Sequence, residues 1–320
     1  MAIAELDAEV LLTKETSQIQ AIWQRFRKHR LALVGIGVLA LLFLFSFAGT
    51  SFSPYSPEDQ FLSDPYGLPT RAFLLGTDEL GRDVMTRLMW AGRISLVLSI
   101  FVTLCTETIG TIAGSISGYF GGWADTLIMR TVDVLLTLPT LPLLLILSAM
   151  TLRGGFPLQS PEILNRFFAW IWGMTPDAAG LVMILAGILI IFGWMGTARL
   201  VRGQILSLRN MEYADAARSL GASSWHIIIR HMIPNSLAPI IVSATFSFGG
   251  VIVLEAALSF LGFGVQPPSA SWGSLLNNVR DYMLIQPWRA FVPGLAIFLA
   301  SISYNFIGDA LRDALDPRLK

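Results

Sequence analysis

Two acidic residues lie inside apolar stretches of this sequence, and they are the first candidates for chemistry. Glu107 lies in the run that ends near Tyr119, and Glu255 lies in the run that follows Ser236. A carboxylate inside a membrane is costly unless it faces protein or water, and such residues are typical of ion or proton pathways. A second interpretation stays open: each glutamate accepts a hydrogen bond from a neighbouring helix or lies near the lipid headgroups. Glu255 lies about nineteen residues, roughly 28 Å of helix, after Ser236, so we expect it near the outer face, in reach of water, as a gate or interhelical hydrogen-bond group.

The patterns that support common enzymatic chemistry do not occur in the sequence. It has no G-x-x-x-x-G-K-[ST] phosphate loop, no H-E-x-x-H zinc motif and no G-x-S-x-G nucleophile motif. The three histidines, His29, His226 and His231, fall outside the apolar runs. The single cysteine, Cys105, excludes an internal disulfide and a multi-thiolate metal site. We therefore expect a non-catalytic chain with no metal site and no cofactor of its own.

One long polar segment interrupts the apolar second half of the sequence. Residues 212–235 read EYADAARSLGASSWHIIIRHMIPN, which is typical of two short helices with a break between them. Asn210 is placed to cap the first helix, and Ser223 or Ser224 is placed to cap the second. Gly221 stands where a helix C-terminus favours a left-handed residue without a Cβ atom. The pattern predicts a helical hairpin.

The composition of this hairpin suits a docking element. Ala216 and Ala217 keep one face of the first helix narrow, so that another surface can approach closely. Pro234 should end the second helix, because proline disfavours the helical conformation in the residue before it. The alternative is an ordinary helical loop without a docking role. The predicted docking residues are Glu212, Asp215, Ala216, Ala217, Gly221 and Pro234.

The composition of the whole chain identifies a membrane protein. Of its 320 residues, 54% are hydrophobic and 14% are charged. The mean hydropathy of +0.63 is too high for an ordinary soluble domain. The net formal charge is zero, so no basic field favours nucleic acid, and we expect lipid as the surrounding partner.

Six apolar runs are long enough to cross about 30 Å of hydrocarbon as helices. The predicted spans are 31–47, 94–119, 125–151, 178–198, 236–264 and 291–311. Pro139 and Pro142 should kink the third span. Basic residues in 25–30 and 199–209 place these ends in the cytoplasm, so both termini and the hairpin at 199–235 are expected there.

This arrangement divides the chain into two parts. Residues 1–90 hold the cytoplasmic tail, the first span and an extracytoplasmic loop, and residues 91–320 hold a five-helix core with the hairpin. One basic cluster then falls on the extracytoplasmic side, although basic residues normally stay in the cytoplasm. Acidic neighbours are available to pair with this cluster. The basic residues are Arg71, Arg82, Arg87 and Arg93, and the acidic residues are Asp78, Glu79 and Asp83.

Three further features of the sequence predict packing or interfacial structure. Thr77 is placed to cap an amphipathic helix at the membrane interface before the second span. A piece rich in Phe and Trp at 167–172, within an outside loop at 153–177, predicts a second interfacial helix. Gly110, Gly114 and Gly118 form a smooth stripe on one helix face, which lets another helix of this chain or of a partner subunit approach closely.

Several strings in the sequence resemble a known family. Asp215-Ala216-Ala217, then Gly221, then Ile233-Pro234, resembles the EAA loop of ABC importer permeases, with Asp215 in place of the usual Glu and His231 in place of an aliphatic residue. The strings LGTDELGRDVMTRLMWAGRISL, GYFGGWADTLIMRTVDV, EAALSFLGFGVQPPSASWGSLL and GDALRDALDPRLK resemble the dipeptide, oligopeptide and nickel importers.

This resemblance implies the C-type permease subunit of a peptide importer in the prokaryotic inner membrane. The implied fold is an all-α polytopic membrane protein with six transmembrane helices, the type I ABC importer permease fold. The implied partners are a second, homologous permease subunit, two ATP-binding subunits that carry ATP and Mg, and an extracytoplasmic substrate-binding protein. In that family the EAA loop inserts into a groove on the ATPase. The alternative is a secondary transporter or channel that uses Glu107 and Glu255.

Overall fold

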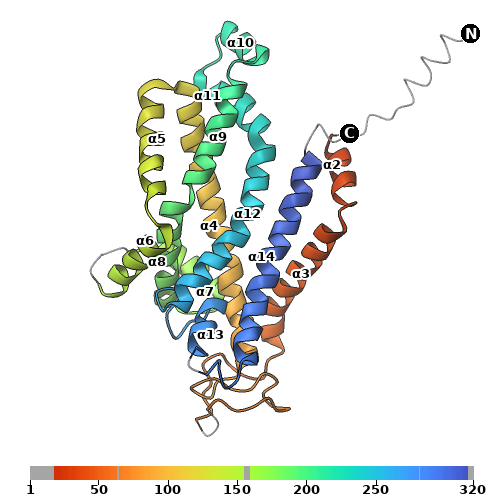
Figure 1. The fold of residues 1–320 in the computed structure, drawn as a ribbon, viewed down its shortest axis with the longest axis vertical. Helices are drawn as coiled ribbons and strands as arrows, with labels where there is room; N and C mark the ends of the chain where they lie inside the picture. Colours follow the sequence, from red (N-terminus) through yellow and green to blue (C-terminus); the bar gives the residue numbers. More distant parts are fainter. Residues whose placement is uncertain (1–17, 63–64, 155–158, 281, 316–320) are drawn as a thin grey trace, which may run out of the picture.

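The computed structural model describes residues 18–62, 65–154, 159–280 and 282–315, which form a long bundle of helices (Figure 1). A loop-rich segment, residues 49–83, covers one end of the bundle, which we call the loop end. A helical hairpin projects from the opposite end, which we call the hairpin end. The predicted tails at 1–17 and 316–320 lie outside the described residues.

The helices fall in three groups along the chain. The first is α2 (Gln18–Phe26), α3 (Arg30–Phe47), η1 (Gly49–Ser51) and α4 (Val84–Phe120). The second is α5 (Gly122–Thr137), α6 (Thr140–Leu152), α7 (Glu162–Trp172), α8 (Pro176–Gly193) and α9 (Met195–Leu208). The third is α10 (Glu212–Ser219), α11 (Ser224–Ile227), η2 (Ile228–Met232), α12 (Ile233–Phe260), α13 (Trp272–Asn278) and α14 (Trp288–Leu315).

The all-helical membrane architecture is confirmed. Five helical segments are long and apolar enough to cross a membrane, and the bent pair α5 and α6 makes a sixth if it counts as one span. The two helices of that pair meet at 89°, and Pro139 precedes the first residue of α6. Leu138 is extended because the ring of the following proline disfavours a helical conformation there. The predicted kink is therefore a full break.

The predicted interfacial helix that begins at Thr77 is wrong. The chain enters α4 only at Val84, where the Asp83 carboxylate caps the helix by accepting from the Thr86 N–H at 2.8 Å. Gly76 and Gly81 have φ values of +72° and +74°, which a right-handed helix cannot contain. The first turns of α4 belong to the second span itself, which runs for 37 residues without interruption.

The predicted glycine stripe lies against α9 of the same chain. A Cβ atom on Gly110 would lie 2.7 Å from the carbonyl oxygen of Trp194. On Gly114 it would lie 2.5 Å from the carbonyl oxygen of Ala198, and on Gly118 2.8 Å from the Cβ of Ile205. These distances leave no room for a side chain, so the stripe lets the backbones of α4 and α9 touch.

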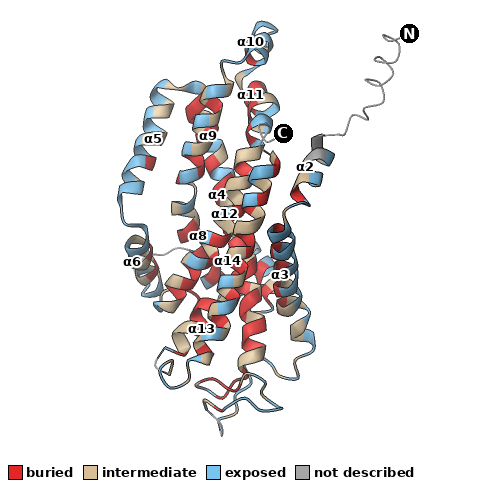
Figure 2. Ribbon diagram, turned by 45° about the vertical axis from the view of Figure 1, so that its right-hand side comes forward, coloured by how far each residue is buried: buried red, intermediate tan, exposed pale blue. Residues whose placement is uncertain are grey.

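The interior is densest towards the loop end, where Figure 2 shows buried segments of several helices together. One cluster surrounds Trp172 and Phe168 of α7 and packs against α8. The predicted interfacial helix at 167–172 thus exists but begins earlier, at Glu162, and buries one side within the protein. A second cluster surrounds Trp272, which is fully buried between α4 and α14. The proposed division of the chain near residue 90 stays a prediction.

Candidate functional site

The hairpin at 212–232 consists of α10, a sharp turn, α11 and the wider η2 turn. Gly221 has a φ of +80°, in the left-handed region expected for the break. The Ser223 hydroxyl caps α11 by accepting from the His226 N–H at 3.3 Å. The cap predicted for Asn210 is wrong, because Met211 occupies the N-cap position and no side chain caps α10.

Pro234 does not end the second helix, contrary to the sequence-based prediction. It lies in the first turn of α12, which continues from η2. The Ile233 N–H donates to the Ile228 carbonyl, five residues back, so the helix widens by one residue just before the proline. A widened turn needs no N–H from Pro234 and relieves the clash of its ring with the preceding turn.

The docking residues predicted on α10 differ in their exposure. Glu212, Asp215 and Ala216 are exposed, whereas Ala217 is half-buried and packs with Ala214 in a hydrophobic cluster that the hairpin shares with α9 and α12. Asp215 pairs with Arg218 at 2.6 Å, and this guanidinium also donates to the Arg209 carbonyl at 2.6 Å. The free face of the first helix is therefore the side that carries Ala216 and the acidic residues.

The outward surface of the hairpin is apolar at its tip. Leu220, next to Gly221 at the tip, is 89% exposed, and nearer the base Trp225 and Ile229 are 53% and 62% exposed. Of the hairpin, α10 projects beyond the bundle at the top of Figure 1, whereas α11 lies level with the ends of α5 and α9. An exposed apolar tip of this kind needs a partner surface to cover it.

The base of the hairpin is fixed to the bundle by contacts that sequence reasoning missed. Arg202 of α9 donates two hydrogen bonds of 2.6 Å to the Asp125 carboxylate of α5. Arg209 donates to the Gly118 carbonyl at 3.2 Å, and the rings of Trp225 and Phe120 lie edge to face at 5.9 Å. These contacts connect the base of the hairpin to α4, α5 and α9.

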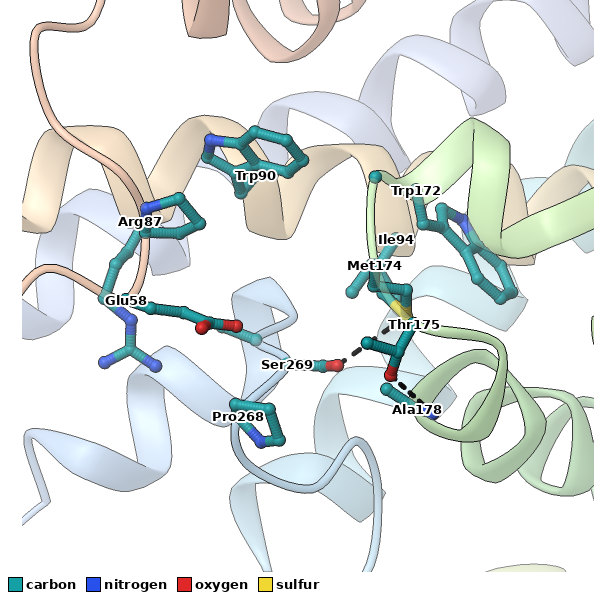
Figure 3. Close-up of a pocket in the computed structure, with 13 residues that line it drawn as sticks. Glu58, Arg87, Trp90, Ile94, Trp172, Met174, Thr175, Ala178, Pro268 and Ser269 are labelled. Carbon is teal, nitrogen blue, oxygen red and sulfur yellow. Dashed lines mark hydrogen bonds between the residues drawn. The ribbon is translucent and has the colours of Figure 1, made fainter. Parts of the chain in front are cut away.

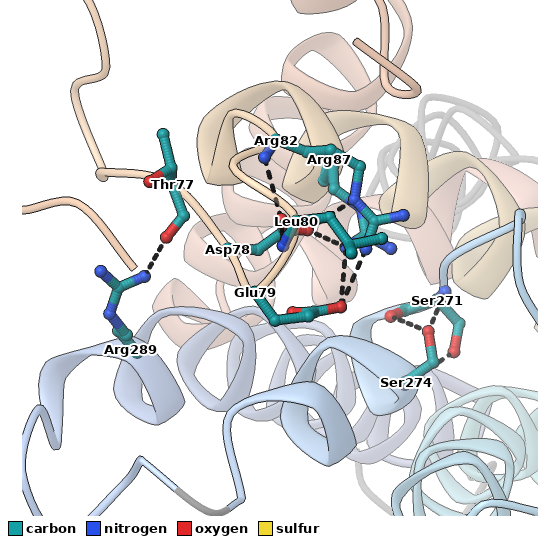
Figure 4. A network of polar contacts seen from close by, with 9 residues as sticks. All are labelled: Thr77, Asp78, Glu79, Leu80, Arg82, Arg87, Ser271, Ser274 and Arg289. Atoms are coloured by element: carbon teal, nitrogen blue, oxygen red, sulfur yellow. Dashed lines mark hydrogen bonds and ion pairs between the residues drawn. The ribbon is translucent and has the colours of Figure 1, made fainter. Parts of the chain in front are cut away.

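The loop end carries a network of charged residues (Figure 4). The predicted pairing of arginines with acidic neighbours is confirmed for two of them: the Asp78 carboxylate contacts both Arg82 and Arg87, and Glu79 pairs with Arg82 at 2.8 Å. All but Glu79 are buried. Because these arginines are neutralised by acidic partners, they add little to the excess of positive charge that normally keeps a loop in the cytoplasm.

Arg289 at the start of α14 locks the loop from the other side. Its guanidinium donates to the carbonyls of Thr77 and Gly67, which lie 212 and 222 residues earlier in the chain. Only 1% of this side chain is exposed. Sequence reasoning missed Arg289, because no local pattern links residues so far apart.

A small cavity of ≈ 80 Å³ lies beside this network (Figure 3). Trp90 and Trp172 line it together with Glu58 and Arg87. Since Arg87 is buried and already paired with Asp78, its charge is satisfied within the protein. The cavity belongs to the packing of the loop end.

Glu255 lies near the loop end, as predicted, but it does not reach water. It is 1% exposed, and its carboxylate accepts hydrogen bonds from Ser259 at 2.6 Å and Ser95 at 3.3 Å. Ser95 also accepts from the Trp272 N–H at 3.2 Å, which ties α4, α12 and α13 together. The predicted solvent contact is wrong because α13 covers this part of α12.

Glu107 lies at the meeting point of three helices. Its carboxylate accepts hydrogen bonds from Thr197 of α9 at 3.0 Å and from Ser247 and Ser243 of α12 at 2.8 and 3.3 Å. It is 6% exposed, and no cation pairs with it among the residues that the structure describes. Three hydroxyl donors stabilise the carboxylate without cancelling its charge.

Comparison with known protein families gives two matches. Residues 110–320 match the family described as binding-protein-dependent transport system inner membrane component. Residues 17–69 match the N-terminal transmembrane domain of oligopeptide transport permease C.

Several characterised bacterial proteins resemble the chain over nearly its whole length. A glutathione transport system permease protein of Pectobacterium atrosepticum is 40% identical over 93% of this chain and 90% of its own. A dipeptide transport system permease protein of Bacillus subtilis is 36% identical over 98% of this chain and 90% of its own. The oligopeptide permease protein of the same organism is 34% identical over 98% and 94% of the two chains.

Proposed function

The chain belongs to the binding-protein-dependent inner membrane components and is an ABC transporter permease, and from this premise we propose that it forms half of the path by which di- or oligopeptides enter a bacterial cell. The family assignment does not favour the alternative of a secondary transporter or channel that uses Glu107 and Glu255. The names of the relatives, which transport glutathione, dipeptides and oligopeptides, support a peptide cargo.

The observation that carries this proposal is the hairpin. Its apolar tip at Leu220 is exposed, and its base is tied to α4, α5 and α9 through Asp125, Arg202 and Arg209. An ATP-binding subunit that holds the tip and moves would therefore move the helices that line the path. Because this chain has no phosphate loop in its sequence, ATP and Mg belong to the two partner ATPases.

The orientation of the chain follows from this role. The hairpin end faces the cytoplasm, together with both termini, and the loop end faces the extracytoplasmic binding protein. The basic residues before α3 support this orientation. The predicted second permease subunit completes the path, and of the two glutamates predicted as path or gate residues, Glu107 is bonded to serines that line an open cavity, whereas Glu255 is enclosed.

The test is ATP-dependent uptake in proteoliposomes that contain this chain, its partner permease and its ATPases, with the cognate binding protein added outside. We expect a labelled tripeptide to accumulate only when ATP is present inside the vesicles and the binding protein is present outside. Uptake that follows a pH gradient without ATP would contradict the proposal and restore the secondary-transporter alternative.

A further inference from the structure

A large cavity opens on the surface of the bundle towards the hairpin end, outside the regions discussed so far. Its volume is ≈ 930 Å³, and α9, α12 and α14 form its walls. Its lining includes Gln204, Ser243, Ser247 and Arg312. The other lining residues are apolar, so the four polar side chains, which at membrane depth face protein or water in preference to lipid, mark the part of the cavity suited to a polar ligand.

The wall of this cavity carries the two serines that donate to Glu107. Ser247 and Ser243 both line the cavity, and both direct their hydroxyl hydrogens back to the carboxylate at 2.8 and 3.3 Å. A hydroxyl that donates one hydrogen bond still has lone pairs to accept another. A molecule in the cavity therefore meets acceptor oxygens with the Glu107 carboxyl group directly behind them.

The opposite end of the cavity carries a positive charge. Arg312 lies three residues before the end of α14, one helix turn beyond Gly308, and lines the cavity. A Cβ atom on Gly308 would lie 2.7 Å from Thr245 Oγ1, so Arg312 is level with about residue 241 of the antiparallel α12, and Ser247 lies deeper. Six residue steps along α12 from that level to Ser247 correspond to about 9 Å. A fully extended tripeptide is about 10 Å long. A short peptide with both termini charged fits between the two ends.

We infer that this cavity is a transient binding site for the peptide during transport, in which Glu107, through Ser243 and Ser247, attracts the peptide's amino terminus and Arg312 attracts its carboxyl terminus. This inference rests on the proposed peptide cargo. It gives Glu107 a part in selecting cargo: an ammonium group is stabilised at the deep end, and a blocked or anionic end is not.

The test uses the permease pair with its ATPases in lipid nanodiscs, without the binding protein. The probe is the photoreactive tripeptide Ala-benzoylphenylalanine-Ala, either with a free amino group or N-acetylated. We expect the free peptide to crosslink to residues 200–204 or 238–247 at least about tenfold more than the acetylated peptide, since hydrogen bonds to charged groups contribute about 1.5–3 kcal/mol. Glu107→Gln should remove this preference.

Glu255→Gln is the matched control, because it makes the same change at a buried glutamate whose serine donors, Ser95 and Ser259, do not line the cavity. The preference for the free peptide should persist in this variant even if its transport is slower. A preference that persists in Glu107→Gln, or crosslinks that map elsewhere, would overturn the inference.

A second measurement covers the case in which Glu107→Gln does not assemble. Ser247→Cys, with Cys105→Ala to remove the native thiol, is treated with cationic and anionic methanethiosulfonate reagents. Each reaction rate is divided by the rate of the same reagent with a free thiol in solution. We expect the normalised rate of the cationic reagent to be at least about tenfold higher, because the Glu107 carboxylate is close. Equal normalised rates would contradict the site.

The uptake assay described above separates the two proposals. If the wild-type transporter imports the tripeptide but shows no amino-terminal preference at this cavity, only the inference fails. If the transporter does not import peptides even with its binding protein and ATP, the proposed function fails with it.

Discussion

The two ends of this protein are built on different principles. At the loop end, a segment without regular secondary structure is fixed by Arg289, which reaches two carbonyls of residues 49–83, and by the pairing of Arg82 and Arg87 with Asp78. At the hairpin end, regular helices expose Leu220 at the tip and surround an open cavity.

The same difference separates the two buried glutamates. Glu255, near the loop end, is covered by α13 and bonded only to serines that are themselves buried. Glu107, nearer the hairpin end, is bonded to serines that line a cavity. Under the two proposals, the loop end is a rigid frame, and coupling and cargo contact belong to the hairpin end. Four substitutions test it.

The largest effect is expected at the hairpin. Gly221→Val places a β-branched residue at a φ of +80°, which costs about 1–2 kcal/mol and tilts α10 against α11. Uptake should fall below detection while the permease remains folded, so either the ATPases do not assemble with it or they hydrolyse ATP without transport. Gly203→Val is the control, since Gly203 has open space and an ordinary helical conformation. Normal uptake by Gly221→Val at normal protein levels would remove the coupling role.

The second effect is expected at the loop end, and on stability. Arg289→Met leaves two buried carbonyls without their charged donor, and we expect a loss of about 3 kcal/mol. The measurement is thermal unfolding of the purified complex in detergent. Arg280→Met serves as the control, because Arg280 is exposed. Equal unfolding temperatures for the two variants would show that the loop end is not held by Arg289.

The third prediction concerns the helices that join the two ends. Gly114→Leu forces a side chain against the backbone of α9 and should destabilise the chain by about 1–3 kcal/mol. Gly187→Leu is matched to it, since a Cβ atom on Gly187 meets nothing within 4 Å. If Gly114→Leu keeps the thermal stability and subunit ratio of the parent, α4 and α9 do not pack as closely as the structure indicates.

The smallest effect is expected at Glu255. Glu255→Gln keeps the shape and most of the hydrogen bonding at a site that has no access to water, so ATP-driven uptake should persist at a rate reduced by less than about tenfold. The measurement is uptake by parent and variant at several pH values, and both profiles should have the same form. Complete loss of uptake, with a pH dependence that disappears in the variant, would instead assign proton transfer to Glu255.

Much of the fold could be predicted from the sequence because the forces involved are local. Length and hydropathy predict the spans, since about twenty apolar residues in a helix match the thickness of the hydrocarbon. The left-handed break at Gly221 and the interruption at Pro139 follow from backbone sterics. The local pattern failed where two signals competed: Thr77 resembles a helix cap, but Gly76 and Gly81 prevent a helix from starting there.

Only the tertiary structure decided what the polar residues do. The sequence places two glutamates in apolar runs, but Ser95 and Ser259 enclose Glu255, whereas Ser243 and Ser247 connect Glu107 to a cavity. It shows arginines near the loop end, but not that Arg289 holds a loop more than 200 residues earlier in the chain. Hydrogen bonds and burial depend on which helices meet, and residues far apart in the sequence become neighbours only when the bundle packs.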